Sequence, residues 1–259
     1  MDHLFHSWTR AVETPHVRSV SLFAPLNWIA AGLQDLWRAA PVSLAYGVAF
    51  AGFGFVATSL AWERPHLVTA LASGFFLVAP FLAIGFYEAS RRLTRGEAPG
   101  YRDMWRAWSR NPESIGLFGL ALVLMVIAWE RLSAILFALF VGGNLPDAQS
   151  LAEQVLFSGE HLGFLMAYVG LGAVLAGVTF AISVVTVPML IDRDVDVVSA
   201  MMTSLKVVAV NPLAMLLWAA AIVVLVLGGI ATFFAGLVIT LPLVAHATWH
   251  AYRGMVEAE

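Results

Sequence analysis

The chain has 259 residues, of which 60% are hydrophobic and 12% are charged, with a formal net charge of −3. Its mean hydropathy is +0.83. Because soluble domains carry about 25% charged residues, this composition excludes an ordinary soluble domain. The absence of cysteine excludes disulfides, thiolate metal sites and cysteine nucleophiles. Several runs of about 18 or more nearly uncharged residues can cross a bilayer as helices, so we expect an all-α membrane protein.

The N-terminal residues 1–25 differ from the rest of the chain because they are polar and have no sustained periodicity. They lack the apolar core of a signal peptide. We therefore expect a mobile cytoplasmic N-terminal segment, followed by a single six-span membrane domain over residues 26–256 whose first span directs insertion.

Residues 26–40 have the pattern of an amphipathic helix. Apolar side chains recur at three- and four-residue steps, and polar side chains fall largely off that face. The apolar set is Leu26, Ile29, Ala30, Leu33, Leu36 and Trp37, and the polar set is Asn27, Gln34, Asp35 and Arg38. Together with its two tryptophans, this pattern predicts a helix that lies in the headgroup layer.

The apolar segments that follow are punctuated by proline. Pro41, Pro112 and Pro212 suit a first helical turn, where the missing N–H costs nothing. We expect six transmembrane helices at 42–61, 66–87, 113–128, 162–191, 213–229 and 231–250. The mostly apolar residues 132–141 are too few to cross the membrane, so they either extend the third helix or lie at the outer interface.

Basic residues are distributed unevenly between the loops of this topology. With a cytoplasmic N-terminus, 12 of the 14 basic residues fall on the cytoplasmic side, and only Arg64 and Arg131 fall outside. The positive-inside rule therefore predicts a multi-pass protein with both termini in the cytoplasm.

The prolines also indicate a threefold internal repeat. The three opening prolines each follow an amphipathic stretch, and Pro80, Pro188 and Pro242 each lie late in a returning span. We expect three Pro-punctuated hairpins, each preceded by a cytoplasmic interfacial amphipathic helix. The repeats would cover about 26–98, 99–194 and 195–253, and the third hairpin would turn at Gly228–Gly229.

The final span carries a histidine pair. His246 and His250 lie four residues apart, with Trp249 and Tyr252 beside them. Two histidines at this spacing share a helix face and can bind one metal ion, or each can hold a haem iron axially. Because no third histidine lies nearby, the favoured interpretation is an anchoring belt of aromatic and histidine side chains at the helix end. No catalytic residue and no resident cofactor are predicted.

Two other groups of charged residues are candidate functional or interface positions. Glu63–Arg64 and Glu130–Arg131 would lie at the outer membrane boundary, either as snorkelled anchors or as a gate for an anion or substrate. The second group is a basic surface made of Arg91, Arg92, Arg95, Arg102, Arg106 and Arg110. We expect this surface to face anionic lipid headgroups, with a membrane-protein partner as the second interpretation and no nucleic acid partner.

Four segments carry a family resemblance: PLNWIAAGLQDLWRAAPVSLAYG (25–47), APFLAIGFYEASRRLTRGE (79–97), NPLAMLLWAA (211–220) and PLVAHATWHAYR (242–253). Together they resemble an uncharacterised family of bacterial integral-membrane proteins, a domain of unknown function found mainly in proteobacteria. Some members are labelled as cytochrome c oxidase subunits. The resemblance covers residues 17–256 and is most specific at HATWHAYR. It implies a location in the bacterial inner membrane and a link to respiratory complexes.

These observations favour a non-enzymatic accessory, scaffold or assembly factor of the inner membrane. The near absence of charged residues inside the predicted spans argues against an ion-driven transporter. A passive channel or small-solute permease is the alternative, and haem or metal handling through His246 and His250 is a third. Substrate, partner and oligomeric state are not indicated by the sequence.

Overall fold

The structure is a computed structural model that describes residues 15–63, 83–140 and 162–257. Within these ranges the regular structure is helical, apart from one β-bridge between Val17 and Val256. The helices are α1 (Ala24–Arg38), α2 (Ala40–Glu63), residues 83–94, α4 (Tyr101–Arg106), α5 (Pro112–Phe140), α7 (Leu162–Ser183), α8 (Thr186–Asp192), α9 (Val197–Val210), α10 (Pro212–Ala231) and α11 (Leu237–Met255). A short 3₁₀ turn, η2 (Ala107–Ser109), follows α4.

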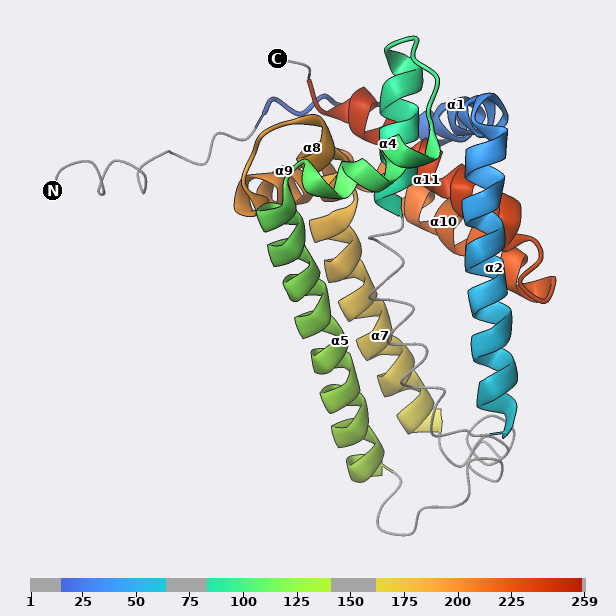
Figure 1. Cartoon of the computed structure of the whole chain (residues 1–259). Helices are drawn as coiled ribbons and strands as arrows, with labels where there is room; N and C mark the ends of the chain where they lie inside the picture. The colour runs from blue at the N-terminus through green and yellow to red at the C-terminus, as the bar shows by residue number, and fades with distance from the viewer. Residues whose placement is uncertain (1–14, 64–82, 141–161, 258–259) are drawn as a thin grey trace, which may run out of the picture.

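The long helices extend from one end of the molecule. Figure 1 shows α2, α5 and α7 running away from the end where α1, α4, α8 and α9 gather. α5 and α7 are antiparallel neighbours, because Trp129 contacts Tyr168 and Phe137 contacts Phe164. The polar chemistry of the chain is concentrated at the end where the short helices gather.

Four helical segments of the described chain are long and apolar enough to cross a membrane: Ala40–Ser59, Pro112–Phe140, Leu162–Asp192 and Pro212–Ala231. Most of the predicted span 66–87 lies outside the described residues, although its end falls in the helix at 83–94. α11, which covers the predicted sixth span, is not one of the four segments. The count of six spans therefore stays a prediction.

The third predicted span is longer than expected. α5 is continuous from Pro112 to Phe140, so residues 132–140 extend the helix instead of forming a separate interfacial segment. At 1.5 Å per residue its 29 residues reach about 44 Å, which exceeds the roughly 30 Å hydrocarbon core.

The predicted fourth span is interrupted. The helix breaks at Val184 and Val185, one turn before Pro188, because proline cannot supply the N–H that a continuous helix needs there. Ser204 of α9 compensates for the break, since its hydroxyl donates to the Ala181 carbonyl at 2.7 Å and accepts from the Val185 amide at 3.4 Å.

The turn between α10 and α11 is not at Gly228–Gly229, as predicted. Both glycines lie inside α10, and the chain turns between Thr232 and Gly236. The Thr232 hydroxyl donates to the Gly229 carbonyl at 2.8 Å and accepts from the Gly236 amide at 2.7 Å. A Cβ at Gly229 would lie 2.5 Å from a Leu237 methyl group, so this glycine serves close packing of the two helices and not the turn.

α1 packs on the rest of the protein with part of its predicted polar side and leaves part of its predicted apolar face exposed. Leu26, Leu33 and Trp37 of the predicted apolar face are 58%, 40% and 60% exposed, whereas Asp35 is only 4% exposed. The reason is Gly32, whose hypothetical Cβ would lie 2.6 Å from the backbone nitrogen of Ala247. α1 therefore approaches α11 closely at Gly32, with Trp28 and Leu36 buried as well. Leu26, Leu33 and Trp37 stay on the outside, which is compatible with the predicted position in the headgroup layer.

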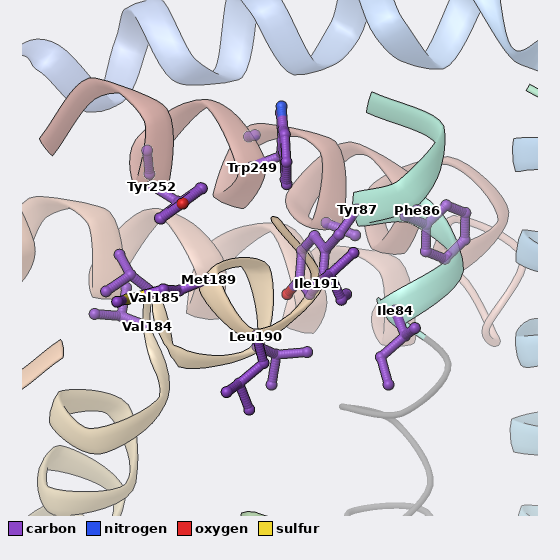
Figure 2. Close-up of a cluster of buried hydrophobic side chains, with 14 of the residues drawn as sticks. Ile84, Phe86, Tyr87, Val184, Val185, Met189, Leu190, Ile191, Trp249 and Tyr252 are labelled. Carbon is purple, nitrogen blue, oxygen red and sulfur yellow. The ribbon is translucent and has the colours of Figure 1, made fainter. Parts of the chain in front are cut away.

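A buried core joins α8, α11 and the helix at 83–94. Figure 2 shows side chains of these three segments together, among them Phe86, Met189, Leu190 and Trp249. Each of these four side chains is at most 1% exposed. This core fixes α11, and with it His246, relative to the rest of the molecule.

The described part of the N-terminal segment is held in place, although the sequence predicts a mobile segment. The Arg18 amide donates to the Met255 carbonyl at 2.8 Å, and the Glu257 amide donates to the His16 carbonyl at 3.1 Å. The Asn211 side chain bonds the Val20 amide and the Arg18 carbonyl. Residues 16–20 therefore dock beside the C-terminal end of α11.

The order of elements is compatible with the repeat. Short helices precede the proline-opened helices α2, α5 and α10. The first returning span lies largely outside the described residues, however, so the threefold repeat stays a prediction.

Candidate functional site: a buried polar network around His246

The histidine pair of α11 lies at the centre of a polar network that joins four segments of the chain. His246 is fully buried, whereas the side chain of His250 is 26% exposed. The partners of the pair come from α1, from the first turn of α2 and from the helix at 83–94. The close approach of α1 at Gly32 places Asp35 within reach of α11.

Both ring nitrogens of His246 bond serine hydroxyls. Its Nε2 lies 2.9 Å from the Ser43 hydroxyl of α2, and its Nδ1 lies 2.7 Å from the Ser90 hydroxyl. The ring also meets Phe86 edge to face, with centroids 5.5 Å apart. Ser43 and Ser90 are themselves fully buried.

The carboxylate of Asp35 closes the network. The Ser90 hydroxyl donates to its Oδ2 at 2.7 Å, and His250 Nε2 lies 2.8 Å from the same oxygen. Buried charges are tolerated only when they are paired and hydrogen-bonded, and Asp35 meets both conditions. Asp35 thus links α1 to α11 and to the helix at 83–94.

The direction of these bonds fixes the tautomer of His246. Because the Ser90 hydroxyl donates to Asp35, it must accept from His246 Nδ1–H. In the neutral imidazole, Nε2 then accepts from the Ser43 hydroxyl. The hydrogen bonds therefore run in one direction, from Ser43 through His246 and Ser90 to Asp35.

The network lowers the pKa of the Asp35 carboxyl. Burial on its own raises this pKa, but hydrogen bonds from His250 and Ser90 and the neighbouring imidazoles outweigh it. The net pKa lies below the ordinary value of 3.8, so Asp35 is an anion at neutral pH.

Ser43 and His246 have the spacing of a nucleophile and its general base. The Ser43 hydroxyl has no exposed surface, however, so no substrate reaches it in this conformation. A metal ion would also have to displace a serine hydroxyl, since both nitrogens of His246 are engaged. No group of three or more metal-ligating side chains occurs in the described residues. The arrangement is best suited to holding helices together.

The other two predicted site residues of α11 are buried and do not form a surface belt. Trp249 packs against Tyr252 with ring centroids 5.5 Å apart, and its indole N–H donates to the Thr94 hydroxyl at 3.4 Å. The Tyr252 hydroxyl donates to Asp192 at 2.9 Å and accepts from Arg193 at 2.9 Å. This second cluster ties the end of α8 to α11.

The predicted basic surface is divided by a buried ion pair. Arg91 is 5% exposed and binds Glu88 through two hydrogen bonds of 2.7 and 3.0 Å, so it does not face lipid as expected. Arg110 also reaches Glu88, at 3.1 Å, and Arg92 pairs with Glu97 and Asp103. Glu88 and Arg91 have the i,i+3 spacing at which helical side chains pair, whereas the bonds from Arg110 to Glu88 and from Arg92 to Asp103 join positions 22 and 11 residues apart. Arg95, Arg102 and Arg106 remain exposed.

The two Glu–Arg pairs are only partly placed. Arg64 and the side chain of Glu63 lie outside the described residues. Glu130 and Arg131 are exposed on α5, about 27 Å along the helix from Pro112, which is near one hydrocarbon thickness. Their position agrees with the predicted outer boundary, and the helix continues beyond them.

Sequence reasoning missed Asp35, Ser43 and Ser90 as partners of the histidines. They lie 156 to 215 residues away from their partners along the chain. The one local signal was Gly32, whose spacing to Asp35 places both on the same side of the helix. An acidic residue one turn from a glycine in a helix is a candidate for a buried helix contact.

A comparison with known families identifies the middle of the chain. Residues 67–192 match the model of DUF2189, described as a predicted integral membrane protein. The chain is similar to this family over these residues. No curated protein and no solved structure matches the chain.

The match to DUF2189 covers less of the chain than the resemblance over residues 17–256 implies. The HATWHAYR ending lies outside the matched range. Of the network around His246, only Ser90 lies within the matched range. Asp35, Ser43 and both histidines are contributed by the flanking segments.

Proposed function

We propose that this protein is a non-catalytic accessory, scaffold or assembly factor of the bacterial inner membrane, with a respiratory complex as its client. In this proposal both termini are cytoplasmic and the long helices present a surface to membrane-protein partners. The family is described only as integral membrane proteins, so the client is inferred from the sequence resemblance.

The exposure of α5 is the observation that carries the proposal. The buried residues of this helix all lie between Ser114 and Leu122, and none from residue 123 to Phe140 is buried. Leu124, Ile127 and Ile135 are each about half exposed, at 57%, 48% and 54%. Association of helices in a membrane depends on packing between such surfaces. α5 therefore has a long apolar face available to another membrane helix.

The polar network supports a structural role over a chemical one. The network is hydrogen-bonded throughout and almost entirely removed from solvent. It consists of the hydroxyls of Ser43 and Ser90, the imidazole of His246 and the carboxylate of Asp35. A fully satisfied buried network rigidifies a fold and specifies one arrangement of helices. A rigid layer at one end of the molecule would present the long helices in a fixed geometry.

The test compares two exposed sites by complementation of a deletion strain. Leu124→Trp on α5 adds bulk without adding polarity, and Val224→Trp on α10, where Val224 is 69% exposed, is the matched control. We expect the deletion to reduce assembled respiratory complex on native gels. The wild-type and Val224→Trp chains should restore assembly, and Leu124→Trp should not.

Four outcomes would contradict the proposal. One is a chain that migrates alone after mild solubilisation, with respiratory complexes intact on deletion. Ion or solute flux in proteoliposomes would support the passive channel or permease instead. A Soret band or bound metal that is lost in His246→Gln would support haem or metal handling. Covalent labelling of Ser43 by a fluorophosphonate would indicate an enzyme.

A further inference from the structure

Two exposed surfaces, one on α1 and one on α4, meet at a single corner of the molecule. The Tyr101 hydroxyl donates to the Pro41 carbonyl at 2.9 Å, which joins the start of α4 to the junction of α1 and α2 across 60 residues of sequence. Trp37 and Arg38 end α1 at this junction, and Arg102 follows Tyr101. The structure therefore brings basic residues of two segments to the same place.

The corner is rich in exposed aromatic side chains. Trp37, Tyr101 and Trp105 are 60%, 55% and 73% exposed, and Trp105 stacks at a tilt on Trp108 with centroids 6.5 Å apart. Tryptophan and tyrosine are enriched at the membrane–water interface, because their rings are amphipathic. This composition is typical of a surface at headgroup level.

The basic residues of the corner differ from the others in the cluster. Arg38, Arg102 and Arg106 are exposed, and across the described ranges none of them forms an ion pair, whereas Arg91, Arg92 and Arg110 are all paired with carboxylates. Arg102 and Arg106 lie four residues apart and so share one side of α4. Three guanidinium groups thus remain available to an external anion.

The depth of the corner follows from α2. The apolar segment of α2 begins at Ala40, two residues after Arg38, so the corner lies at the boundary of the hydrocarbon core. One side of α1 is exposed beside the corner. It carries Leu26, Leu33 and Trp37, which are spaced by seven and four residues. An exposed apolar helix side next to arginines is the arrangement by which a helix lies in the headgroup layer.

We propose that this corner, formed by Trp37, Arg38, Tyr101, Arg102, Trp105 and Arg106, binds the phosphate of anionic phospholipids in the leaflet where α2 begins. Guanidinium groups match phosphate through paired N–H donors, and the aromatic rings contact the acyl–headgroup boundary. The site goes beyond the accessory role and does not depend on it, because it concerns how the protein is anchored in its own leaflet.

The experiment titrates the purified full chain in detergent with short-chain phosphatidylglycerol or with phosphatidylcholine of the same chain length, and follows tryptophan fluorescence. We expect phosphatidylglycerol to bind more tightly and the preference to fall with added salt. Near an anionic surface each arginine contributes roughly fivefold in affinity, so Arg102→Gln with Arg106→Gln should weaken phosphatidylglycerol binding by roughly 25-fold.

The control removes the same charge elsewhere. Arg95→Gln with Arg131→Gln alters two exposed arginines outside the corner and should leave the preference unchanged. Arg102→Lys with Arg106→Lys keeps the charge and should lose less affinity than the glutamine pair. Equal loss in the control, or no preference between the two lipids, would overturn the proposal. Full competition by inorganic phosphate would show a site for a free anion and would also overturn it.

Discussion

Asp35 shows how one buried carboxylate can determine the relative position of three helices. Its Oδ2 accepts hydrogen bonds from Ser90 and His250, and through Ser90 it orients the ring of His246. When one partner is removed from a buried polar network, the remaining polar groups lose a hydrogen bond but stay out of water, which costs free energy. The stability of the α1–α11 contact should therefore be sensitive to this side chain.

Asp35→Asn is expected to destabilise the protein by about 2–4 kcal/mol, because two hydrogen bonds to a charged acceptor are weakened. Asp194→Asn is the matched control, since Asp194 is exposed on the loop before α9. Thermal unfolding in lipid nanodiscs should show a lower melting temperature for Asp35→Asn only. Equal melting temperatures for the two variants would show that the network adds no stability.

The lowered pKa of Asp35 predicts a pH dependence. A carboxyl whose pKa is lower in the folded than in the unfolded protein contributes stability that is fully present above the unfolded pKa. This contribution is lost as the pH falls from 3.8 through the lower folded value. The difference in melting temperature between wild type and Asp35→Asn should therefore be constant near pH 7 and shrink below about pH 4. A difference that grows on acidification would contradict the assignment.

At the level of elements, the closest approach of α1 to α11 is a glycine contact. Gly32 lies against the backbone of Ala247, and this contact sets the distance over which Asp35 reaches its partners. Backbone atoms cannot move aside as a flexible side chain can. The position of the whole network therefore depends on the absence of a side chain at residue 32.

Gly32→Ala should destabilise the protein by about 1–3 kcal/mol, because its Cβ would lie 2.6 Å from the Ala247 nitrogen and 2.9 Å from the Ala247 Cα. Gly52→Ala in α2 is the control, since its Cβ would enter open space and alanine favours a helix. Melting temperatures in nanodiscs measure both. An unchanged melting temperature for Gly32→Ala would mean that α1 and α11 can move apart without a loss of stability.

At the scale of the whole molecule, the short helices α1, α4, α8 and α9 gather at one end, and α2, α5 and α7 run away from it (Figure 1). Glu97 belongs to the loop between the helix at 83–94 and α4, whereas Leu139 is 74% exposed near the far end of α5. About 41 Å of helix separates Leu139 from Pro112. The two positions should lie on opposite sides of the membrane.

This arrangement predicts the outcome of cysteine labelling, for which the cysteine-free chain is already a suitable background. In intact spheroplasts a membrane-impermeant maleimide should label Leu139→Cys but not Glu97→Cys. In inverted vesicles the pattern should reverse. Labelling of both positions from one side would contradict the topology predicted from the distribution of basic residues.

The sequence by itself determined the class of this protein and the places where most described helices begin. Hydropathy requires apolar helices, since in lipid each backbone polar group must be bonded within its own segment. The opening prolines mark the starts of α5 and α10, and Pro41 is the second residue of α2. These features are local, so they can be predicted from neighbouring residues.

Only the tertiary structure decided how the side chains are used. Asp35 is buried rather than exposed, Arg91 pairs with Glu88 rather than facing lipid, and His246 bonds two serines. The burial of these side chains depends on which helix lies opposite, although Glu88 and Arg91 themselves lie one turn apart on one helix. A helical pattern shows which residues share a face, but it does not show what that face meets. Contacts between residues 156 or more positions apart are set by helix packing, and no local spacing encodes them.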